Sequence, residues 1–191
     1  TNVSHEHLDY HKTYENYVKA KEKLLLMART PVINRDDKSY AYFSPDVLKK
    51  AITYSRYEAA DINEIKFPFK SLLPGNYNRY ICLGAIAVCK SIGLSDNDIR
   101  QALLSFTPVP GRFEHIDNDQ NLNIIIDFAH TPNSFLEVLQ AAKSETKRKL
   151  IHVFGCAALR DHSKRPLMGE SSARFADMIV LTEEDYRTED V

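Results

Sequence analysis

The sequence has few of the residues that mark disulfide-rich, zinc-binding or membrane proteins. It has no tryptophan and three cysteines, none of which forms a CxxC pair. Free thiols are therefore expected rather than a disulfide framework or a zinc site. No apolar run approaches the roughly 18 residues that span a bilayer, and the N-terminus has no apolar signal segment. We therefore expect a cytoplasmic protein.

An excess of charge of one sign is also missing. The 191 residues carry 25 Lys and Arg against 26 Asp and Glu, a formal net charge of −1. This balance gives no electrostatic reason to expect nucleic acid or an anionic membrane as a partner. We expect neither, and we expect a monomer. The length and the 43% of hydrophobic residues suit one large domain or two small ones.

The six glycines form no phosphate-binding loop, because their spacing fits neither GxxxxGK[ST] nor GxGxxG. No Ser or Cys stands in a recognisable nucleophile elbow either. Any nucleotide chemistry therefore needs a phosphate loop from outside these residues. Since the chain also starts without Met, we interpret it as an internal fragment.

The first 109 residues predict a mixed α/β region. Helical spacing of apolar residues predicts a helix over residues 12–28. The apolar stripe of this helix consists of Tyr14, Tyr17, Val18, Leu24 and Leu25. Short strands are expected at 31–34, 40–43 and 52–55, with a short helix at 46–50. Residues 78–92 are apolar nearly all round, as in a buried helix, and Ser95 begins a second helix at 96–106.

The pattern changes after the segment TPVPGR, residues 107–112. Its two prolines and one glycine indicate a domain boundary at about residue 110. Strands are expected at 113–117, 122–127, 149–154 and 178–182, and helices at 132–143 and 165–176. Apolar β-branched runs alternating with helices predict a parallel sheet covered on both faces. The expected fold class is α/β, with domains at 1–109 and 110–191.

Polar side chains follow three of the C-terminal strands. The clusters are Asp127 with His130, then Arg160-Asp161-His162 with Lys164-Arg165, then Glu183-Glu184-Asp185 with Arg187. In open parallel sheets ligands bind beyond the carboxyl ends of the strands, so the three clusters are expected to share one cleft. The alternative is that strand-to-helix loops are polar in any such fold.

Thr131-Pro132 has the form of an N-cap followed by proline at the first helical position. Such a helix N-terminus can face an anion. Asp127 and His130 lie just before it. Two structural alternatives stay open: Asp127 as the cap of a turn, and His130 as a loop histidine with its hydrogen bonds satisfied.

The segment HEHLDYH places His5, His7, Asp9 and His11 immediately before the first predicted helix. These side chains are metal ligands, but the spacing matches no zinc motif. Lys21 falls on the apolar stripe of that helix. It can snorkel to water, or it can lose its charge and add carbon dioxide to form a carbamate, an anionic oxygen ligand suited to Mg²⁺.

Six segments in this order resemble the Mur ligases along the whole chain. They are TNVSHEHLDYHKTYENYVKAKEKLL, LPGNYNRYICLGAIA, VPGRFEHID, IIDFAHTPNS, VFGCAALRDHSKRPLMGE and LTEEDYRTED. The nearest branch adds the third amino acid of the peptidoglycan stem peptide. The resemblance implies the last part of the central ATP-binding domain at 1–109. It implies the first part of a Rossmann-like C-terminal glutamate ligase domain at 110–191.

The resemblance implies an ATP-dependent ligase that acts on UDP-N-acetylmuramoyl-L-alanyl-D-glutamate. ATP phosphorylates the terminal carboxylate, and the amine of meso-diaminopimelate or lysine attacks the acyl phosphate. Mg²⁺ screens the phosphate charge. Because the phosphate loop and the UDP-binding domain are missing, the fragment alone is expected to be inactive.

The resemblance also implies roles for individual residues. His7 matches a Mg²⁺ ligand, and Lys21 matches a lysine that is carbamylated in the family. Asn78, Arg112 and Asp127 match positions that hold ATP, and His130 lies in the same motif. Arg187, with Asp185 beside it, matches the arginine that reads the distal carboxylate of the incoming amino acid.

The sequence departs from the family pattern in four places. Ile81 stands where many relatives have a second Asn, and Cys156-Ala157-Ala158 stands where a Gly-Gly pair is usual. Glu184-Asp185-Tyr186-Arg187 replaces the Asp-Asn-Pro-Arg of relatives that add meso-diaminopimelate, which leaves the amino acid open. The stretch between Asp61 and Leu73 is short, as if a hairpin were lost.

Two alternatives remain at this point. One is another ligase of the superfamily, acting on a folate or a poly-amino acid. Arg187 within TEEDYRTED argues against it. The other is a non-catalytic relative serving as a binding module, which the departures at Ile81 and Ala157-Ala158 keep open.

Overall fold

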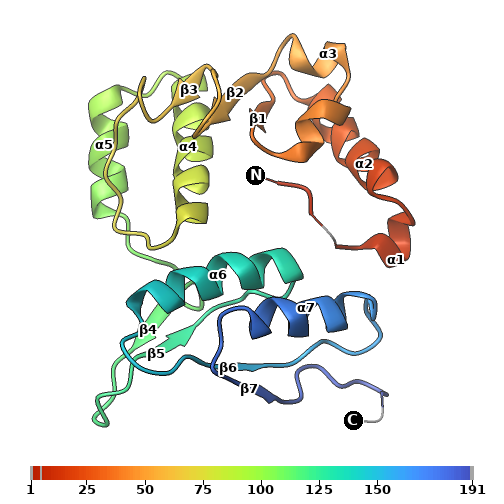
Figure 1. The fold of residues 1–191 in the computed structure, drawn as a ribbon. Coiled ribbons are helices and arrows are strands. Elements are labelled where there is room, and N and C mark those ends of the chain that lie inside the picture. The colour runs from red at the N-terminus through yellow and green to blue at the C-terminus, as the bar shows by residue number, and fades with distance from the viewer. Residues whose placement is uncertain (1, 5, 190–191) are drawn as a thin grey trace. The chain divides into compact units, whose positions relative to one another are not determined.

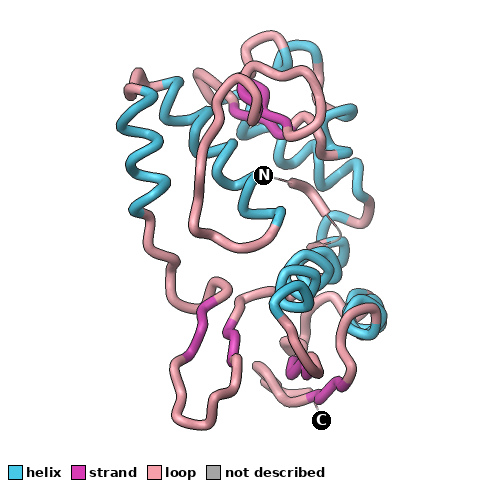
Figure 2. The backbone as a smooth tube through the Cα atoms, turned by 60° about the vertical axis from the view of Figure 1, so that its left-hand side comes forward, coloured by secondary structure: helices cyan, strands magenta, loops and turns pink. Residues whose placement is uncertain are grey.

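The computed structural model describes residues 2–4 and 6–189, and the chain divides into two compact units. Unit 1 comprises Thr1–Ser4 with His11–Thr107, and unit 2 comprises His5–Tyr10 with Pro108–Val191. Figures 1 and 2 show the course of the chain through both units. Each unit mixes helices and strands, so the chain has the α/β class that the sequence predicts.

Unit 1 contains a small parallel sheet with helices around it. The strands are β1 (Val32–Asn34), β2 (Ile52–Ser55) and β3 (Ile62–Asn63), paired in that order. The helices are α2 (Tyr14–Met27), η1 (Lys38–Tyr42, a 3-10 helix), α3 (Pro45–Leu48), α4 (Asn76–Ser91) and α5 (Asp96–Ser105). The short helix α1 (Leu8–His11) lies at the junction of the two units in sequence.

Side-chain caps set the starts of α2 and α5. Thr13 accepts a hydrogen bond from the Asn16 N–H at the start of α2, and Ser95 accepts one from the Asp98 N–H at the start of α5. The strand predicted at 40–43 is wrong. The Asp37 carboxylate accepts from the Ser39 N–H and starts a 3-10 helix there instead, so local capping outweighs the β propensity of the tyrosines.

The core of unit 1 consists of two clusters. The larger one packs the inner face of α4 onto the sheet, with Tyr54, Leu83 and Ile86 each at most 2% exposed. The smaller one joins α2 to β1 and α3 through Val18, Ile33 and Val47. Although α4 is apolar nearly all round, it buries only one face. On the other face Ile81 and Val88 are 45% and 47% exposed.

Unit 2 contains two separate strand pairs and two helices. The antiparallel pair is β4 (Glu114–Ile116) with β5 (Ile124–Ile126), and the parallel pair is β6 (Ile151–Phe154) with β7 (Met178–Leu181). The helices are α6 (Pro132–Glu145) and α7 (Lys164–Ala173). They pack on each other and on β6 through Phe135, Leu139 and Met168.

The prediction of a single parallel sheet covered on both faces is wrong for the part of unit 2 that the structure describes. The β4–β5 pair is an antiparallel hairpin and is not hydrogen-bonded to β6. Both helices lie on the same side of the β6–β7 pair in Figures 1 and 2. Ile151 and Val153 alternate outward from β6 and are 54% and 58% exposed, so that face has no helix over it.

Among residues 2–4 and 6–189, no helix combines the length and apolar character needed to cross a membrane. The three cysteines are free thiols, as predicted.

Candidate functional site

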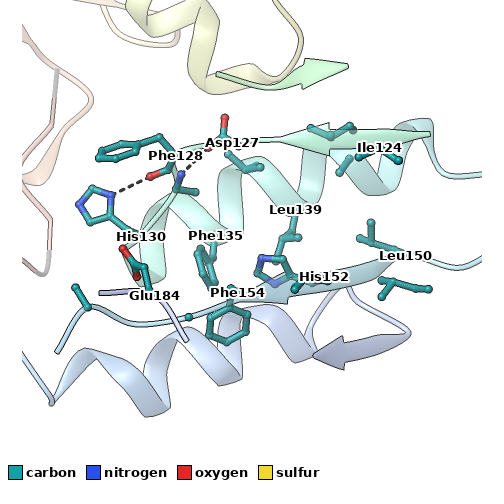
Figure 3. A pocket seen from close by; sticks show the side chains of 18 of the residues that line it. Ile124, Asp127, Phe128, His130, Phe135, Leu139, Leu150, His152, Phe154 and Glu184 are labelled. Carbon is teal, nitrogen blue, oxygen red and sulfur yellow. Dashed lines mark hydrogen bonds between the residues drawn. The ribbon is translucent and has the colours of Figure 1, made fainter. Parts of the chain in front are cut away.

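A broad open cleft of about 1940 Å³ runs along unit 2, and all of its lining residues belong to that unit. Its walls include the loops that follow β5, β6 and β7, together with Glu6, His7 and Asp9. The prediction that the three polar clusters share one cleft is therefore confirmed. Figure 3 shows Asp127, Phe128, His130 and Glu184 at one end, with Phe135, His152 and Phe154 along the middle.

Asp127 stands directly after β5 and ties two backbone segments together. Its Oδ2 accepts a hydrogen bond from the Phe113 N–H at 2.8 Å, and its Oδ1 accepts one from the Ala129 N–H at 2.7 Å. The carboxylate is half-buried. These contacts give Asp127 the turn-capping position that the sequence left as an alternative, and its place on the cleft wall is compatible with a ligand contact as well.

His130 is fixed by its own loop. Its Nδ1 lies 2.9 Å from the carbonyl oxygen of Phe128, which makes Nδ1 the protonated nitrogen, and its backbone N–H donates to Ser134 Oγ at 3.1 Å. Nε2 is left facing Glu6 Oε1 at 3.4 Å. Next to it, Thr131 and Ser134 form the predicted cap of α6, in which each side chain accepts from the other's N–H.

Lys164 is a buried ammonium beside His130, and sequence reasoning gave it no individual role. Its side chain is 9% exposed, and Nζ donates to the carbonyl oxygen of His130 at 3.0 Å. Glu6 Oε1 lies 3.6 Å from the same nitrogen. A buried charge is stable only when it is paired and hydrogen-bonded, so these two partners hold Lys164 in place. The available signal was its position in the polar cluster after β6.

The loop after β7 carries Asp185 and Arg187 on the cleft wall. Arg187 Nε donates to Asp185 Oδ2 at 2.8 Å, and the Ala158 N–H donates to the Asp185 carbonyl oxygen at 2.7 Å. The side chain of Arg187 is 37% exposed, and its guanidinium retains further donors for a ligand. The two predicted amino-acid-binding residues are therefore neighbours in one hydrogen-bonded pair.

Arg112 lies against the same end of unit 2. Its guanidinium carbon stands 4.5 Å from the centroid of the Phe128 ring, a cation–π contact, and Phe128 lines the cleft. Phe128 is 59% exposed and also meets the His130 ring edge-on at 4.9 Å. This exposed aromatic ring between two cationic or polar groups is a surface on which a planar ligand could stack.

The floor of the cleft is apolar and neutral. His152 stacks on Phe154 at 4.8 Å and meets the edge of Phe135 at 4.7 Å, and its Nδ1 lies 2.8 Å from Ser172 Oγ. Burial lowers the pKa of His152, and burial raises the pKa of the nearby Cys156 thiol. The side chains that could bind or react with a ligand therefore lie at the rim of the cleft and not on its floor.

Two predicted residues lie in unit 1. Asn78 is buried in the first turn of α4, and its side-chain amide donates to the Pro74 carbonyl oxygen at 2.5 Å. Lys21 is exposed on α2, with Nζ 5.3 Å from the centroid of the Tyr17 ring. Of the two alternatives for Lys21 on the apolar stripe, this exposure fits the first, in which the amine reaches water: α2 buries only Val18 fully and leaves Leu24 68% exposed. Burial within unit 1 therefore gives no reason for this amine to lose its charge.

The described residues of the HEHLDYH segment form no metal site by themselves. His5 lies outside the described residues, His7 and Asp9 are exposed on unit 2, and His11 stacks on Tyr17 at 4.8 Å in unit 1. Across residues 2–4 and 6–189 no three His, Cys, Asp or Glu side chains converge as a metal would require. His7 has a left-handed backbone, with φ at 55°.

The chain resembles known proteins over both units. Residues 1–89 match the family model of the Mur ligase middle domain, and residues 111–191 match that of the Mur ligase glutamate ligase domain. A Clostridium acetobutylicum protein named UDP-N-acetylmuramoyl-L-alanyl-D-glutamate--2,6-diaminopimelate ligase 1 is 37% identical over 209 residues, which cover 99% of this chain and 43% of that protein. A Clostridium botulinum ligase of the same name without the numeral is 37% identical over 214 residues, covering 100% of this chain and 44% of that protein.

Solved structures of ligases also align with nearly the whole of this chain. A structure of a UDP-N-acetylmuramoyl-L-alanyl-D-glutamate--2,6-diaminopimelate ligase aligns with a TM-score of 0.61 at 29% identity, over 99% of this chain and 44% of that one. A pseudomurein peptide ligase type C from Methanothermus fervidus aligns with a TM-score of 0.74 at 18% identity, over 100% and 53%, and shows the fold alone. The chain spans less than half the length of the curated relatives it matches.

Proposed function

The chain belongs to the Mur ligase family, and we propose that it is part of an ATP-dependent ligase that adds the third amino acid to UDP-N-acetylmuramoyl-L-alanyl-D-glutamate during peptidoglycan biosynthesis. The names of the relatives at 37% identity support this substrate and support 2,6-diaminopimelate as the amino acid. Their 37% identity over nearly the whole of this chain argues against the folate and poly-amino-acid alternatives.

The observation that carries the proposal is the cleft of unit 2. It gathers Asp127, His130, Asp185 and Arg187, four residues proposed for ATP and amino-acid binding, on the loops after two different strands. A ligase of this type needs its phosphate donor and its amine within one site, because most of the rate comes from positioning the two reactants. Loops at the carboxyl ends of strands provide such a place.

The proposed chemistry has two steps. The terminal carboxylate of the muramoyl dipeptide attacks the γ-phosphorus of ATP and releases ADP, which leaves an acyl phosphate. The amine of the incoming amino acid then attacks the acyl carbon, and phosphate leaves after the amine gives up a proton. Arg187 binds the distal carboxylate of that amino acid, and Asp185 holds the guanidinium at the correct angle.

Arg112, Asp127 and His130 are proposed to hold ATP next to the loop that carries Arg187, with Asn78 of unit 1 as a further contact. The exposed Phe128 ring between Arg112 and His130 suits the stacking of a planar base. Asp127, whose two oxygens accept backbone N–H groups, shapes the loop that presents these residues. The buried Lys164 stabilises the same loop, because its Nζ donates a hydrogen bond to the His130 carbonyl oxygen.

Magnesium is proposed as the metal cofactor, with His7 and a carbamylated Lys21 as its protein ligands. Mg²⁺ commonly keeps several waters and takes only one or two protein ligands besides substrate phosphates, which fits a chain whose described residues offer no complete ligand cage. When bound, Mg²⁺ neutralises the charge on the phosphates. Because Lys21 is exposed within unit 1, its carbamylation would need a partner outside that unit.

The domain boundaries are part of the proposal. We assign 1–109 to the end of the central ATP-binding domain and 110–191 to the start of the C-terminal domain of the longer enzyme. The matched stretch of the Clostridium botulinum relative is 214 residues against the 191 of this chain, so this chain lacks residues that the relative has. This difference is consistent with a shortened segment between Asp61 and Leu73.

The experiment is phosphate release by the full-length protein with ATP, Mg²⁺ and UDP-N-acetylmuramoyl-L-alanyl-D-glutamate. Parallel reactions contain meso-diaminopimelate, lysine or no amino acid. We expect release that depends on one amino acid, and we expect meso-diaminopimelate to be that one. Absence of release with every amino acid contradicts the proposal. The 191-residue chain alone should release no phosphate, because it has no phosphate loop.

A further inference from the structure

Arg187 stands in a tight turn whose backbone is unusual for its residue type. The Glu189 N–H donates to the Tyr186 carbonyl oxygen at 3.0 Å, which closes a four-residue turn with Arg187 in second place. The φ angle of Arg187 is 50°, in the left-handed region that residues other than glycine seldom adopt. Such a conformation persists only where surrounding contacts impose it, so the turn needs an anchor.

Glu189 provides that anchor through three contacts. Its Oε1 accepts the Leu159 N–H at 3.0 Å and lies 2.9 Å from His162 Nε2, and its Oε2 accepts from Arg165 Nη2 at 2.7 Å. The Leu159 N–H and the Arg165 guanidinium lower the pKa of Glu189, so the carboxylate is ionised at neutral pH. Charge-assisted hydrogen bonds of this kind are the stronger ones in proteins.

The anchor joins two loops that both line the cleft. Leu159 and His162 belong to the loop after β6, and Arg165 lies in the first turn of α7, whereas Glu189 belongs to the loop after β7. Leu159 also has a left-handed backbone, with φ at 55°. One side chain thus fixes two strained positions, one in each loop.

Glu189 itself does not line the cleft, although Arg160, Asp185 and Arg187 do. Its side chain is 22% exposed and is directed to the protein instead. A second, weaker tie between the loops is the hydrogen bond from the Ala158 N–H to the Asp185 carbonyl oxygen. Removing Glu189 therefore frees Arg187 to move without deleting any group that faces the ligand.

We propose that Glu189 is a positioning residue that sets the affinity for the incoming amino acid by holding the Arg187 turn against the loop after β6. The inference rests on the proposed function, in which Arg187 binds the distal carboxylate of that amino acid. In this inference, the contacts of Glu189 with Arg165 and with the Leu159 N–H hold the site that selects the amino acid in place.

The test is steady-state kinetics of the full-length protein carrying Glu189→Gln or Arg165→Gln, and of the double variant. Glutamine keeps an acceptor for the Leu159 N–H but loses the charge that binds Arg165. We expect each single variant to raise KM for the amino acid roughly tenfold, with kcat and the KM for ATP within about twofold of wild type. The double variant should be no worse than either single one, because both remove the same contact.

The matched control is Glu170→Gln, which removes the exposed Glu170–Arg174 pair of α7 and should leave all three parameters unchanged. An unchanged KM for the amino acid in Glu189→Gln overturns the inference. So does an equal rise of both KM values, since that reports general damage to the fold. Wild-type phosphate release without dependence on an amino acid would instead overturn the proposed function, so the two failures are distinguishable.

Discussion

The two units bury their strands to different extents: unit 1 has strands within a core, and unit 2 has exposed strands beside the candidate site. In unit 1, Tyr54 and Ser55 of β2 are at most 2% exposed. In unit 2, all four residues of β7 are exposed, and so is every second residue of β6. Unit 1 buries its apolar residues in two interior clusters, whereas the described part of unit 2 covers only one face of β6 and has polar loops at the strand ends.

The polar groups of the two units follow the same contrast. In unit 1, Asp36 accepts hydrogen bonds from Ser55 Oγ, the Arg56 N–H and the Tyr80 hydroxyl, and Glu64 binds both Arg56 and Arg79. These carboxylates therefore have their hydrogen-bond and ion-pair partners within unit 1. In unit 2, Arg187 and His130 also have carboxylate neighbours, Asp185 and Glu6, but their side chains line an open cleft, where the further donors of the Arg187 guanidinium can reach a ligand.

The largest expected effect tests whether unit 1 also contributes to catalysis. Lys21→Ala in the full-length protein should reduce kcat on the order of 100-fold or more, the loss typical of removing one group that stabilises charge in a transition state. Added short carboxylates should restore part of the rate by replacing the carbamate. The measurement is amino-acid-dependent phosphate release.

Lys19→Ala is the control, because Lys19 is an exposed lysine of the same helix. It should behave as wild type. If Lys21→Ala retains full turnover, Lys21 has no part in the site, and unit 1 contributes structure only.

The next effect concerns the core. Leu83→Ala deletes a side chain with 0% exposure between α4 and β2, and should destabilise unit 1 by about 2–5 kcal/mol. Val153→Ala on the exposed face of β6 should cost less than about 1 kcal/mol in this chain.

Urea unfolding of the 191-residue chain, followed by circular dichroism, measures both changes. Similar losses in the two variants would mean that the face of β6 is covered after all, and the contrast between the units would fail.

Arg187→Ala should act on one substrate. Because a hydrogen bond to a charged group contributes about 1.5–3 kcal/mol, KM for a carboxylate-bearing amino acid should rise roughly 10- to 150-fold while KM for ATP changes little. Arg174→Ala on the exposed side of α7 is the control. Equal increases in both KM values would remove Arg187 from the amino-acid site.

The smallest effect is a difference in acid sensitivity. Burial lowers the pKa of His152 in unit 2, so its contribution to stability is complete above the unfolded value of about 6.5 and declines as the pH falls below it. For Asp36 in unit 1, burial raises the pKa but hydrogen bonds from Ser55, Arg56 and Tyr80 outweigh it, and the net shift is downward. Its contribution declines only below the unfolded value of about 3.9.

Unit 2 should therefore begin to lose stability as the pH falls below about 6.5, and unit 1 only in more acid solution. Hydrogen exchange of α4 and α6 amides over this range separates the two. His152→Gln should flatten the response of unit 2, and an unaltered pH profile would exclude His152 as its cause.

Much of the secondary structure followed from local chemistry. Thr131-Pro132, Ser95 and the proline-rich segment at 107–112 act through neighbouring residues, so the starts of α6 and α5 were predicted to the residue. The 3-10 helix at Lys38–Tyr42 was not, because the hydrogen bond from the Ser39 N–H to Asp37 competes with an equally local β propensity.

The residues of the candidate site also divide into those that could be predicted from local sequence and those that could not. The polar residues after the strands were found from sequence, since strand ends can be read from apolar runs. The role of Lys164 was not, because its partners His130 and Glu6 are far away in sequence. The apolar stripe of α2 left two environments open for Lys21, since periodicity tells which residues share a face but not whether anything covers it.

The family, the α/β class, the order of most elements and the three polar clusters could be inferred from the residues alone, because each depends on residues close together in the chain. Three features came from the folded chain and not from local patterns: β4–β5 is a separate antiparallel pair, Lys21 is exposed, and Glu189 contacts Leu159, His162 and Arg165. Strand partners, burial and long-range ion pairs depend on which distant segments meet, and that is settled by packing and not by local propensity.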